Sequence, residues 1–295
     1  MNSKNRDDVL KIVDGSYDLH IHPDPDAMRR EFDDYKLVQD LDSVNMAGAI
    51  IKHHGESTCA RATIANQYYN GKAKLYGSLT LNNAVGGLNP AAIENAVKMG
   101  VKLVWMPTKD AVHEQLFLEK PHKDPITILN EDGSLKPVVY EILKLIKEND
   151  LILATGHLDV QEICALCKEA RRRDIKTVLT HPEYSRSIVP AEIQIELSKI
   201  GVIIEKMWLL VEGSLSDELL AERPDFTQFS QDYVFDSMRK IGAKNILLSS
   251  DGGILGHPLP SQIMCDFVAV LLDKGFAPRD VEIMACDVPA QLLGV

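Results

Sequence analysis

Eight short apolar segments rich in β-branched residues recur through the sequence, and amphipathic stretches lie between them. The segments are residues 16–22, 49–53, 75–80, 102–106, 151–155, 177–180, 202–206 and 245–250. A strand followed by a helix pairs in parallel with the next strand through a right-handed crossover, and eight such units close into a barrel. We therefore expect an α/β fold of the (β/α)8 TIM-barrel type, and an open doubly wound sheet is the alternative.

The amphipathic stretches predict helices with recognisable starts and ends. They cover residues 35–45, 90–99, 137–149, 161–173, 190–199 and 232–241. Proline stands near the start of two of them, at Pro90 and Pro190, where its missing N–H has no helical acceptor to lose. The alternation continues without a linker, so residues 1–295 are expected to form a single barrel domain.

Two long segments interrupt the alternation. Residues 108–135, after the fourth strand, are polar and contain the turn sequence Asn130-Glu131-Asp132-Gly133. Residues 209–229 form a second excursion after the seventh strand. Because the loops that follow barrel strands lie on the catalytic face, we expect the first segment there as a lid.

The formal net charge of −11 argues against nucleic-acid binding, which needs clustered cations. The one dense basic run, Arg171-Arg172-Arg173, ends a predicted helix, where cations complement the helix dipole. No apolar run approaches the ~20 residues of a membrane span, and the start of the chain lacks the apolar part of a signal peptide. We expect a cytoplasmic protein that acts on a small-molecule substrate, alone or as a homo-oligomer, without membrane or nucleic-acid partners.

The five cysteines are scattered, and an odd number fits reduced thiols better than a disulfide framework. Cys164 and Cys167 form a C-x-x-C pair within a predicted helix. Because no second thiol pair lies near them, we interpret them as structural residues, neither a redox nor a zinc pair.

Residues that carry chemistry gather where the predicted strands end. The first strand ends in His20-Ile21-His22, and the alternation of side chains along a strand places the two imidazoles on one face. Later strand ends carry Lys52, His54, His157, His181 and Asp251. Barrel active sites lie at the carboxyl ends of the strands, so these side chains should converge.

Imidazole and carboxylate ligands together suit Zn, Mn, Fe or Ni better than Ca or Mg. Each residue alone has an ordinary explanation, as a loop histidine near a helix start or as a turn aspartate before Gly252-Gly253. Their joint position at strand ends favours a shared metal site. We predict one or two divalent transition-metal ions, zinc first, held by His20, His22, His157, His181 and Asp251.

At these positions the chain resembles the amidohydrolase superfamily of metal-dependent TIM-barrel hydrolases. That superfamily carries an H-x-H on its first strand, single histidines on its fifth and sixth, and an aspartate on its eighth. The matching positions here are His20, His22, His157, His181 and Asp251. The ending at residues 286–294 also resembles the N-P-A-x-x-L-G ending common in these enzymes. The resemblance covers essentially the entire chain and implies the superfamily, not the substrate.

The fourth strand departs from this pattern. Binuclear members supply a bridging carboxylated lysine or glutamate there, whereas this strand ends Val104-Trp105-Met106-Pro107. Either the site holds one metal, or another residue bridges two. Lys52 and His54 share one strand parity and should face the site, Lys52 as a carboxylated bridge, a binder of a substrate anion or a general acid. Glu205 is a weaker candidate, because only one of Glu205 and Lys206 should point inward.

The resemblance implies hydrolysis of an amide, cyclic amide, lactone or related ester bond in a small molecule. A divalent metal lowers the pKa of its water from 15.7 toward about 7. Asp251 is predicted to accept the water proton and pass it to the leaving group, and His181 to bind a second metal or stabilise the oxyanion. Lys52 and His54 are predicted to bind substrate. Arg29 and Arg30 could read a substrate carboxylate, but we interpret them as solvated loop charges.

Three alternatives remain. Mononuclear relatives without the fourth-strand ligand decarboxylate unsaturated or aromatic acids, and this chain could do the same. A phosphoesterase is favoured by the histidines after the second strand, although no histidine stands near Asp251. A barrel that only binds a metal or ligand is the third alternative, and the presence of both Asp251 and His181 beside the proposed ligands argues against it.

Overall fold

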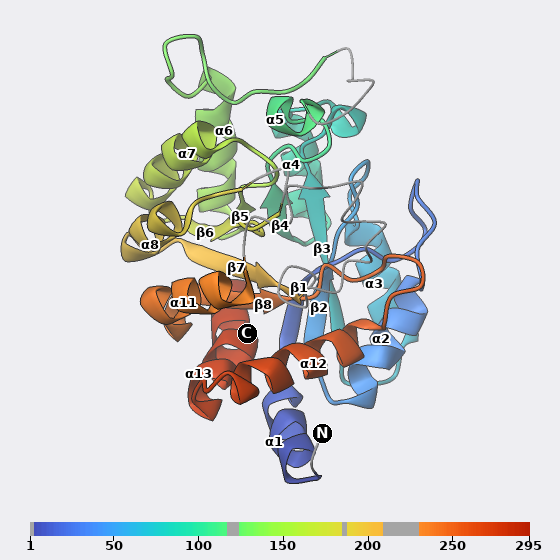
Figure 1. Ribbon diagram of the computed structural model, residues 1–295. Coiled ribbons are helices and arrows are strands. Elements are labelled where there is room, and N and C mark those ends of the chain that lie inside the picture. Colours follow the sequence, from blue (N-terminus) through green and yellow to red (C-terminus); the bar gives the residue numbers. More distant parts are fainter. Residues whose placement is uncertain (1–2, 117–123, 185–187, 209–229) are drawn as a thin grey trace.

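The computed structural model describes residues 3–116, 124–184, 188–208 and 230–295. Eight parallel strands form one sheet in sequence order. They are β1 (Tyr17–Ile21), β2 (Gly48–Ile51), β3 (Lys74–Thr80), β4 (Val101–Trp105), β5 (Ile152–Ala154), β6 (Lys176–Leu179), β7 (Ile203–Met207) and β8 (Ile246–Ser249). A bridge between Ile21 and Gly252 brings the last strand back to the first. The predicted (β/α)8 TIM barrel is confirmed, and each predicted strand is found within two residues of its expected ends (Figure 1).

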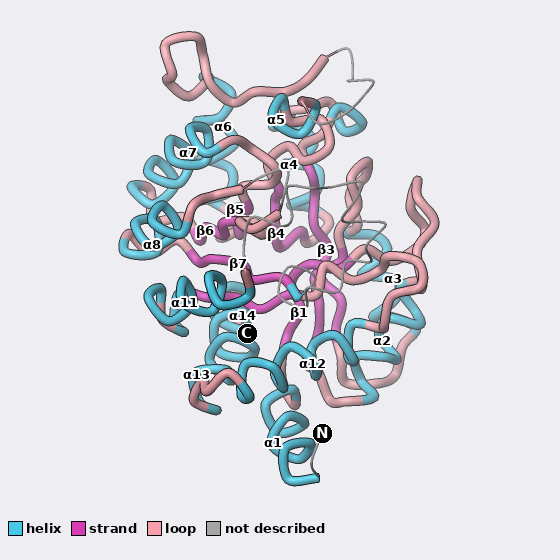
Figure 2. Tube along the Cα trace, viewed as in Figure 1, coloured by secondary structure: helices cyan, strands magenta, loops and turns pink. Residues whose placement is uncertain are grey.

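Helices surround the strands, as Figure 2 shows. They are α1 (Ser3–Val13), α2 (Asp34–Ser43), α3 (Cys59–Tyr68), α4 (Pro90–Lys98), α5 (Val112–Gln115), α6 (Pro137–Glu148), α7 (Val160–Arg172), α8 (Ala191–Lys199), α11 (Gln231–Ile241), α12 (Pro260–Asp273), α13 (Pro278–Glu282) and α14 (Val288–Leu293). The six predicted helices correspond to α2, α4, α6, α7, α8 and α11.

Local capping explains where two of these helices begin. Asp159 accepts a hydrogen bond from the backbone N–H of Glu162 over 2.8 Å, and the Glu162 carboxylate accepts one from the Asp159 N–H, which forms a capping box on α7. Asn89 caps α4, and Pro90 is its first residue. Such caps are worth about 1 kcal/mol each, and they place the starts of α4 and α7 directly after the loops that follow β3 and β5.

The apolar core has two layers. Ile21, Val104 and Leu248 belong to the outer layer, between the strands and the helices. Leu19 and Trp105 belong to the inner layer, inside the barrel. Residues of α14 complete the inner layer, namely Val288, Leu292 and Leu293. The C-terminal helix therefore closes one end of the barrel, and this packing gives a structural reason for the motif at residues 286–294.

The segment after β4 contains the predicted turn. The backbone N–H of Asn130 donates to the carbonyl of Ser134 over 2.8 Å, and Gly133 has a φ of 80°, a conformation that favours glycine. Leu129 and Leu135 form an antiparallel bridge beside the turn. The segment also contains α5, which contributes a side chain to the site described below. The other predicted excursion, residues 209–229, lies outside the described residues.

The cysteines and the helices agree with two expectations from composition. All five cysteines are free, and Cys167 is buried in α7, where burial raises the pKa of its thiol. Across the part of the chain that the structure describes, no helix combines the length and apolar character needed to cross a membrane.

Candidate metal centre

The end of β1 aims two histidines into the barrel. A register irregularity in the β1–β2 pairing lies between Asp18 and Ile21. It lets Leu19 face the barrel interior while Ile21 packs against the helices. His20 and His22 are both buried, with ring centroids 5.4 Å apart. Such irregularities re-aim side chains beside active sites, and the predicted common face of the two imidazoles is found.

Asp18 fixes the backbone beneath this pair. Its carboxylate accepts hydrogen bonds from the backbone N–H groups of His20, over 3.1 Å, and Ser250, over 3.2 Å. Burial raises the pKa of Asp18 to about 7, although these hydrogen bonds act in the opposite direction. Asp18 therefore joins the end of β1 to the end of β8, which delivers Asp251.

His20 lies at the centre of the cluster. Its Nδ1 lies 3.0 Å from Oε1 of Glu205, and its Nε2 lies 3.1 Å from Oδ1 of Asp251. Burial raises the pKa of Glu205, but the charge and hydrogen bond of His20 outweigh burial and lower it to about 2. Because Glu205 is ionised, Nδ1 of His20 donates to it. Nε2, the nitrogen that either a proton or a metal can occupy, then faces Asp251.

Asp251 contacts both histidines of the first strand. Its Oδ1 also lies 3.3 Å from Nε2 of His22. Burial raises the pKa of Asp251, but the two imidazoles bring it well below its usual range, so the carboxylate is ionised at neutral pH. A Cβ on Gly253, two residues after Asp251, would overlap the carbonyl oxygen of His22, and the φ of Gly253 is 114°. The turn that presents Asp251 therefore requires glycine.

His181 and His157 complete the cluster from the ends of β6 and β5. The backbone N–H of His181 donates to Oε2 of Glu205 over 2.9 Å. The His181 ring centroid lies 5.5 Å from that of His20 and 4.9 Å from that of His157. Nδ1 of His157 lies 3.2 Å from Oε2 of Glu114, a buried residue of α5. Two imidazoles, those of His20 and His157, thus have a carboxylate behind them, as metal-binding histidines commonly do.

The donor set fits a divalent transition metal. The ligand atoms of His20, His181 and Asp251 all lie within 4.8 Å of one another. A carboxylate oxygen that faces imidazole lone pairs needs a cation or a proton between them. Burial lowers the pKa of His20, but Asp251 and Glu205 raise it to about 8, so this position attracts positive charge. Two nitrogens and one oxygen are ligands that zinc and its neighbours accept.

His22 lies beside this group with one ring nitrogen to spare. Burial lowers its pKa to about 3, so its imidazole is neutral and able to bind a metal at neutral pH. Its buried Nδ1 has no hydrogen-bond partner among the described residues. Within the group of His20, His181 and Asp251, His22 contacts the Asp251 carboxylate, and His157 contacts the ring of His181.

Lys52 and His54 also reach the site. The Nζ of Lys52 lies 2.9 Å from Nε2 of His20 and 4.1 Å from the ring centroid of Trp105. Burial lowers the pKa of Lys52 to about 8, although Asp251 and Glu205 act in the opposite direction. The ring centroid of His54 lies 4.9 Å from that of His22, and its Nδ1 lies 2.8 Å from Oγ1 of Thr108.

Strand β7 follows the predicted alternation. Glu205 points into the barrel, where Ser249 also donates to it over 2.8 Å. Lys206 points outward and forms a buried ion pair with Glu183.

Strand β4 ends in Trp105, whose ring centroid lies 4.6 Å from that of His20. An indole therefore occupies the position from which binuclear amidohydrolases supply a bridging ligand.

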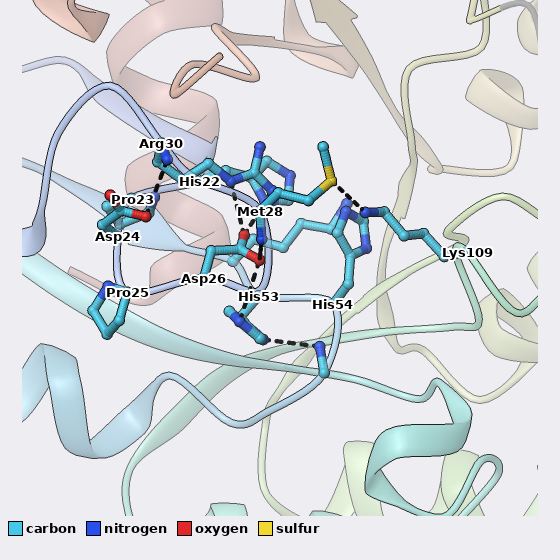
Figure 3. A network of polar contacts seen from close by, with 12 residues as sticks. His22, Pro23, Asp24, Pro25, Asp26, Met28, Arg30, His53, His54 and Lys109 are labelled. Carbon is cyan, nitrogen blue, oxygen red and sulfur yellow. Dashed lines mark hydrogen bonds and ion pairs between the residues drawn. The ribbon is translucent and has the colours of Figure 1, made fainter. Parts of the chain in front are cut away.

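The interpretation of Arg30 as a solvated loop charge is wrong. The side chain of Arg30 is buried. Its guanidinium donates two hydrogen bonds to Oδ2 of Asp26, from Nε over 2.8 Å and from Nη2 over 2.6 Å. Asp26 also lies 3.4 Å from Nε2 of His53. Figure 3 shows this network beside His22. Arg29, the neighbouring residue, is exposed as expected.

Four residues of the site are not predicted from the sequence. Asp18 and Ser249 lie on strands but act through backbone or hydroxyl hydrogen bonds, which residue type alone does not indicate. Glu114 comes from the loop after β4, far in sequence from His157. For Trp105, the sequence signal was the alternation of side chains along β4, which turns Trp105 toward the barrel interior together with Leu103.

Comparisons with known proteins agree with this fold. The sequence matches the family of unknown function DUF6282 over residues 15–205, and a comparison with curated proteins gives no match. An amidohydrolase from Pseudomonas aeruginosa shares the fold with a TM-score of 0.66 and 12% identity, over 96% of this chain and 97% of that one. The probable dipeptidase PvdM of the same organism gives 0.62 and 11%, over 100% and 98%. A probable 2-pyrone-4,6-dicarboxylic acid hydrolase from Acinetobacter baumannii, with citric acid bound, gives 0.58 and 11%, over 95% and 100%.

Proposed function

We propose that this chain, which belongs to the family of unknown function DUF6282, is a metal-dependent hydrolase that cleaves an amide, cyclic amide, lactone or related ester bond of a small molecule. The observation that carries the proposal is the approach of His20, His181 and Asp251 at one end of the barrel, where their ligand atoms lie within 4.8 Å of one another. The hydrolases that share the fold support the same class of reaction.

The metal would be held by His20, His22, His181 and Asp251, with His157 beside them. A divalent ion, zinc first and Mn, Fe or Ni otherwise, supplies Lewis acidity and makes hydroxide available at neutral pH. Glu205 and Glu114 keep the proton on Nδ1 of the imidazoles that they contact, so Nε2 of each remains a ligand. Because Trp105 stands at the end of β4, we propose one ion as the minimum and a second only if another residue bridges.

Asp251 would act as the general base. Its carboxylate is ionised at neutral pH and its side chain is 20% exposed, the most accessible of the group. It can accept a proton from the attacking water and deliver it to the leaving atom. His181, neutral because burial brings its pKa well below the usual range, would stabilise the developing oxyanion if it does not bind the metal. Lys52 and His54 would contact the substrate.

The test combines metal analysis with product analysis. Purified protein is analysed for bound metals and screened against lactones, cyclic amides, phosphoesters and aromatic acids. Asp251→Asn should abolish turnover, and Asp236→Asn, on the exposed side of α11, should leave it unchanged. Release of CO2 from an acid without any hydrolysis would replace the proposal with decarboxylation, and unchanged turnover in Asp251→Asn would reject the proposed base.

A further inference from the structure

Three adjacent strands end in buried hydrogen-bond donors that are not among the proposed metal ligands. They are Lys52 after β2, Thr80 at the end of β3 and Trp105 at the end of β4. Thr80 and Trp105 are register partners, so both side chains point to the same face of the sheet, and Trp105 belongs to the barrel interior. The Nζ of Lys52 lies 4.1 Å from the Trp105 ring centroid. The three donors therefore line one side of the metal centre.

Lys52 is a buried cation without an ion-pair partner. Its side chain is 1% exposed, and within the described part of the chain its hydrogen-bond partner is a histidine nitrogen. Lys206, the other fully buried lysine, contrasts with it, because Glu183, Gln194 and Ser237 all contact its ammonium. Asp251 and Glu205 attract this ammonium without forming an ion pair with it, and a buried ammonium that lacks a direct anionic partner is unfavourable. Its place beside the metal centre suggests that a ligand supplies the missing negative charge.

Trp105 and Thr80 each carry a buried hydrogen-bond donor that could bind the same ligand as Lys52. The indole Nε1 of Trp105 and the hydroxyl of Thr80 are buried, and neither has a hydrogen-bond partner among the described residues. Native proteins rarely leave such groups unpaired. Their shared need is an acceptor, and a carboxylate offers two acceptor oxygens.

The rim of the site adds positive charge. The charges of Arg30 and Lys109 both act on Lys52, and the Nζ of Lys109 lies 3.0 Å from the sulfur of the exposed Met28 (Figure 3). Arg30 uses Nε and Nη2 for Asp26, and its Nη1 has no partner within the described residues. Asp26 pairs with Arg30, and the two cations lie at this edge of a chain whose net charge is −11. Such a rim attracts anions toward the metal centre.

We infer that the substrate is a carboxylic acid whose carboxylate binds between Lys52, Thr80 and Trp105, with Arg30 at the entrance. The inference rests on the proposed hydrolase and adds its substrate class: the reacting bond lies at the metal and the carboxylate lies on the β2–β4 side. An uncharged substrate of the same shape would leave the Lys52 ammonium unpaired, and the site would reject it.

The experiment measures anion binding and metal content separately. Zinc-loaded protein is titrated by calorimetry at low ionic strength with malonate, with its uncharged analogue malonamide and with inorganic phosphate. Zinc per chain is determined in the wild type and in Lys52→Met, Thr80→Val, Arg30→Gln and the matched surface control Arg29→Gln. Thr80→Val keeps the side-chain shape and removes only a hydroxyl without a described partner, so it should fold even if Lys52→Met does not.

The inference predicts that malonate binds at least about tenfold more tightly than malonamide or phosphate, as expected for hydrogen bonds to a charged group. Lys52→Met should weaken malonate binding about tenfold or more with the zinc content unchanged. Thr80→Val should weaken it about threefold or more while raising the melting temperature, because it removes a buried hydroxyl that lacks a partner. Arg30→Gln should weaken it, and Arg29→Gln should not.

Equal malonate affinity in the wild type, Lys52→Met and Thr80→Val, with zinc retained, would overturn the inference and leave the metal centre intact. Tighter binding of phosphate or malonamide than of malonate, or no malonate binding at all, would also overturn it. A wild-type protein that binds no zinc would instead contradict the proposed hydrolase, and the same titrations on that protein would still test the carboxylate subsite.

Discussion

Glu205→Gln tests the carboxylate that holds two of the proposed ligands at once. Its Oε1 accepts from Nδ1 of His20, over 3.0 Å, and from the hydroxyl of Ser249, over 2.8 Å. Its Oε2 accepts from the backbone N–H of His181 over 2.9 Å. An amide keeps the shape but offers one acceptor oxygen and one donor group. At least one of the three donors then faces another donor.

The expected cost follows from these contacts. A hydrogen bond to a charged group contributes about 1.5–3 kcal/mol, and an unpaired buried donor costs about 1–3 kcal/mol. Because Glu205 is 1% exposed, water cannot replace the lost acceptor. The free energy of unfolding should therefore fall by about 3 kcal/mol. The affinity for zinc should fall about 10- to 100-fold, since outer partners of metal-binding histidines have effects of that size.

Urea unfolding measures the first quantity, and competition with a chromophoric chelator measures the second. The matched control is Glu196→Gln on α8, whose side chain is 71% exposed and which should change stability by less than about 0.5 kcal/mol. The reasoning is refuted if Glu205→Gln unfolds at the wild-type urea concentration with an unchanged m value and binds zinc as tightly as the wild type.

Three further predictions concern other parts of the site. Because His20 has a pKa of about 8, a proton competes with the metal below that pH. The apparent affinity for zinc should therefore rise up to about tenfold per pH unit and level off near pH 8. Calorimetry that shows no proton release on zinc binding at neutral pH would contradict this. Glu114→Gln should weaken zinc binding about tenfold if His157 is a ligand, and unchanged affinity would exclude His157 from the centre. Lys206→Met leaves the buried Glu183 unpaired and should cost about 3–5 kcal/mol in urea unfolding, so a loss below about 1 kcal/mol would contradict the ion pair.

The barrel was predictable from the sequence because its signals are local. Each strand is a short apolar run, and each of the six predicted helices starts with a proline or with a capping residue such as Asn89 or Asp159. The convergence of His20, His181 and Asp251 followed from topology alone, because the carboxyl ends of parallel strands meet at one end of a closed sheet.

Contacts between distant segments were not predictable in this way. The alternation rule showed that only one of Glu205 and Lys206 faces inward, but it could not show that Glu205 holds His20. The place of Glu114 depends on how the loop after β4 folds back over His157. Arg30 was misinterpreted because its partner Asp26 lies in the same irregular loop, where no periodic pattern indicates which charges are buried.

The central claim is that a transition metal binds among His20, His181 and Asp251, and anomalous diffraction from zinc-soaked crystals tests it most directly. The account predicts an anomalous peak at the zinc edge within coordination distance, about 2.0–2.3 Å, of nitrogen or oxygen atoms from these three residues. A crystal that shows no such peak at this end of the barrel, or shows zinc only at surface residues, would contradict it.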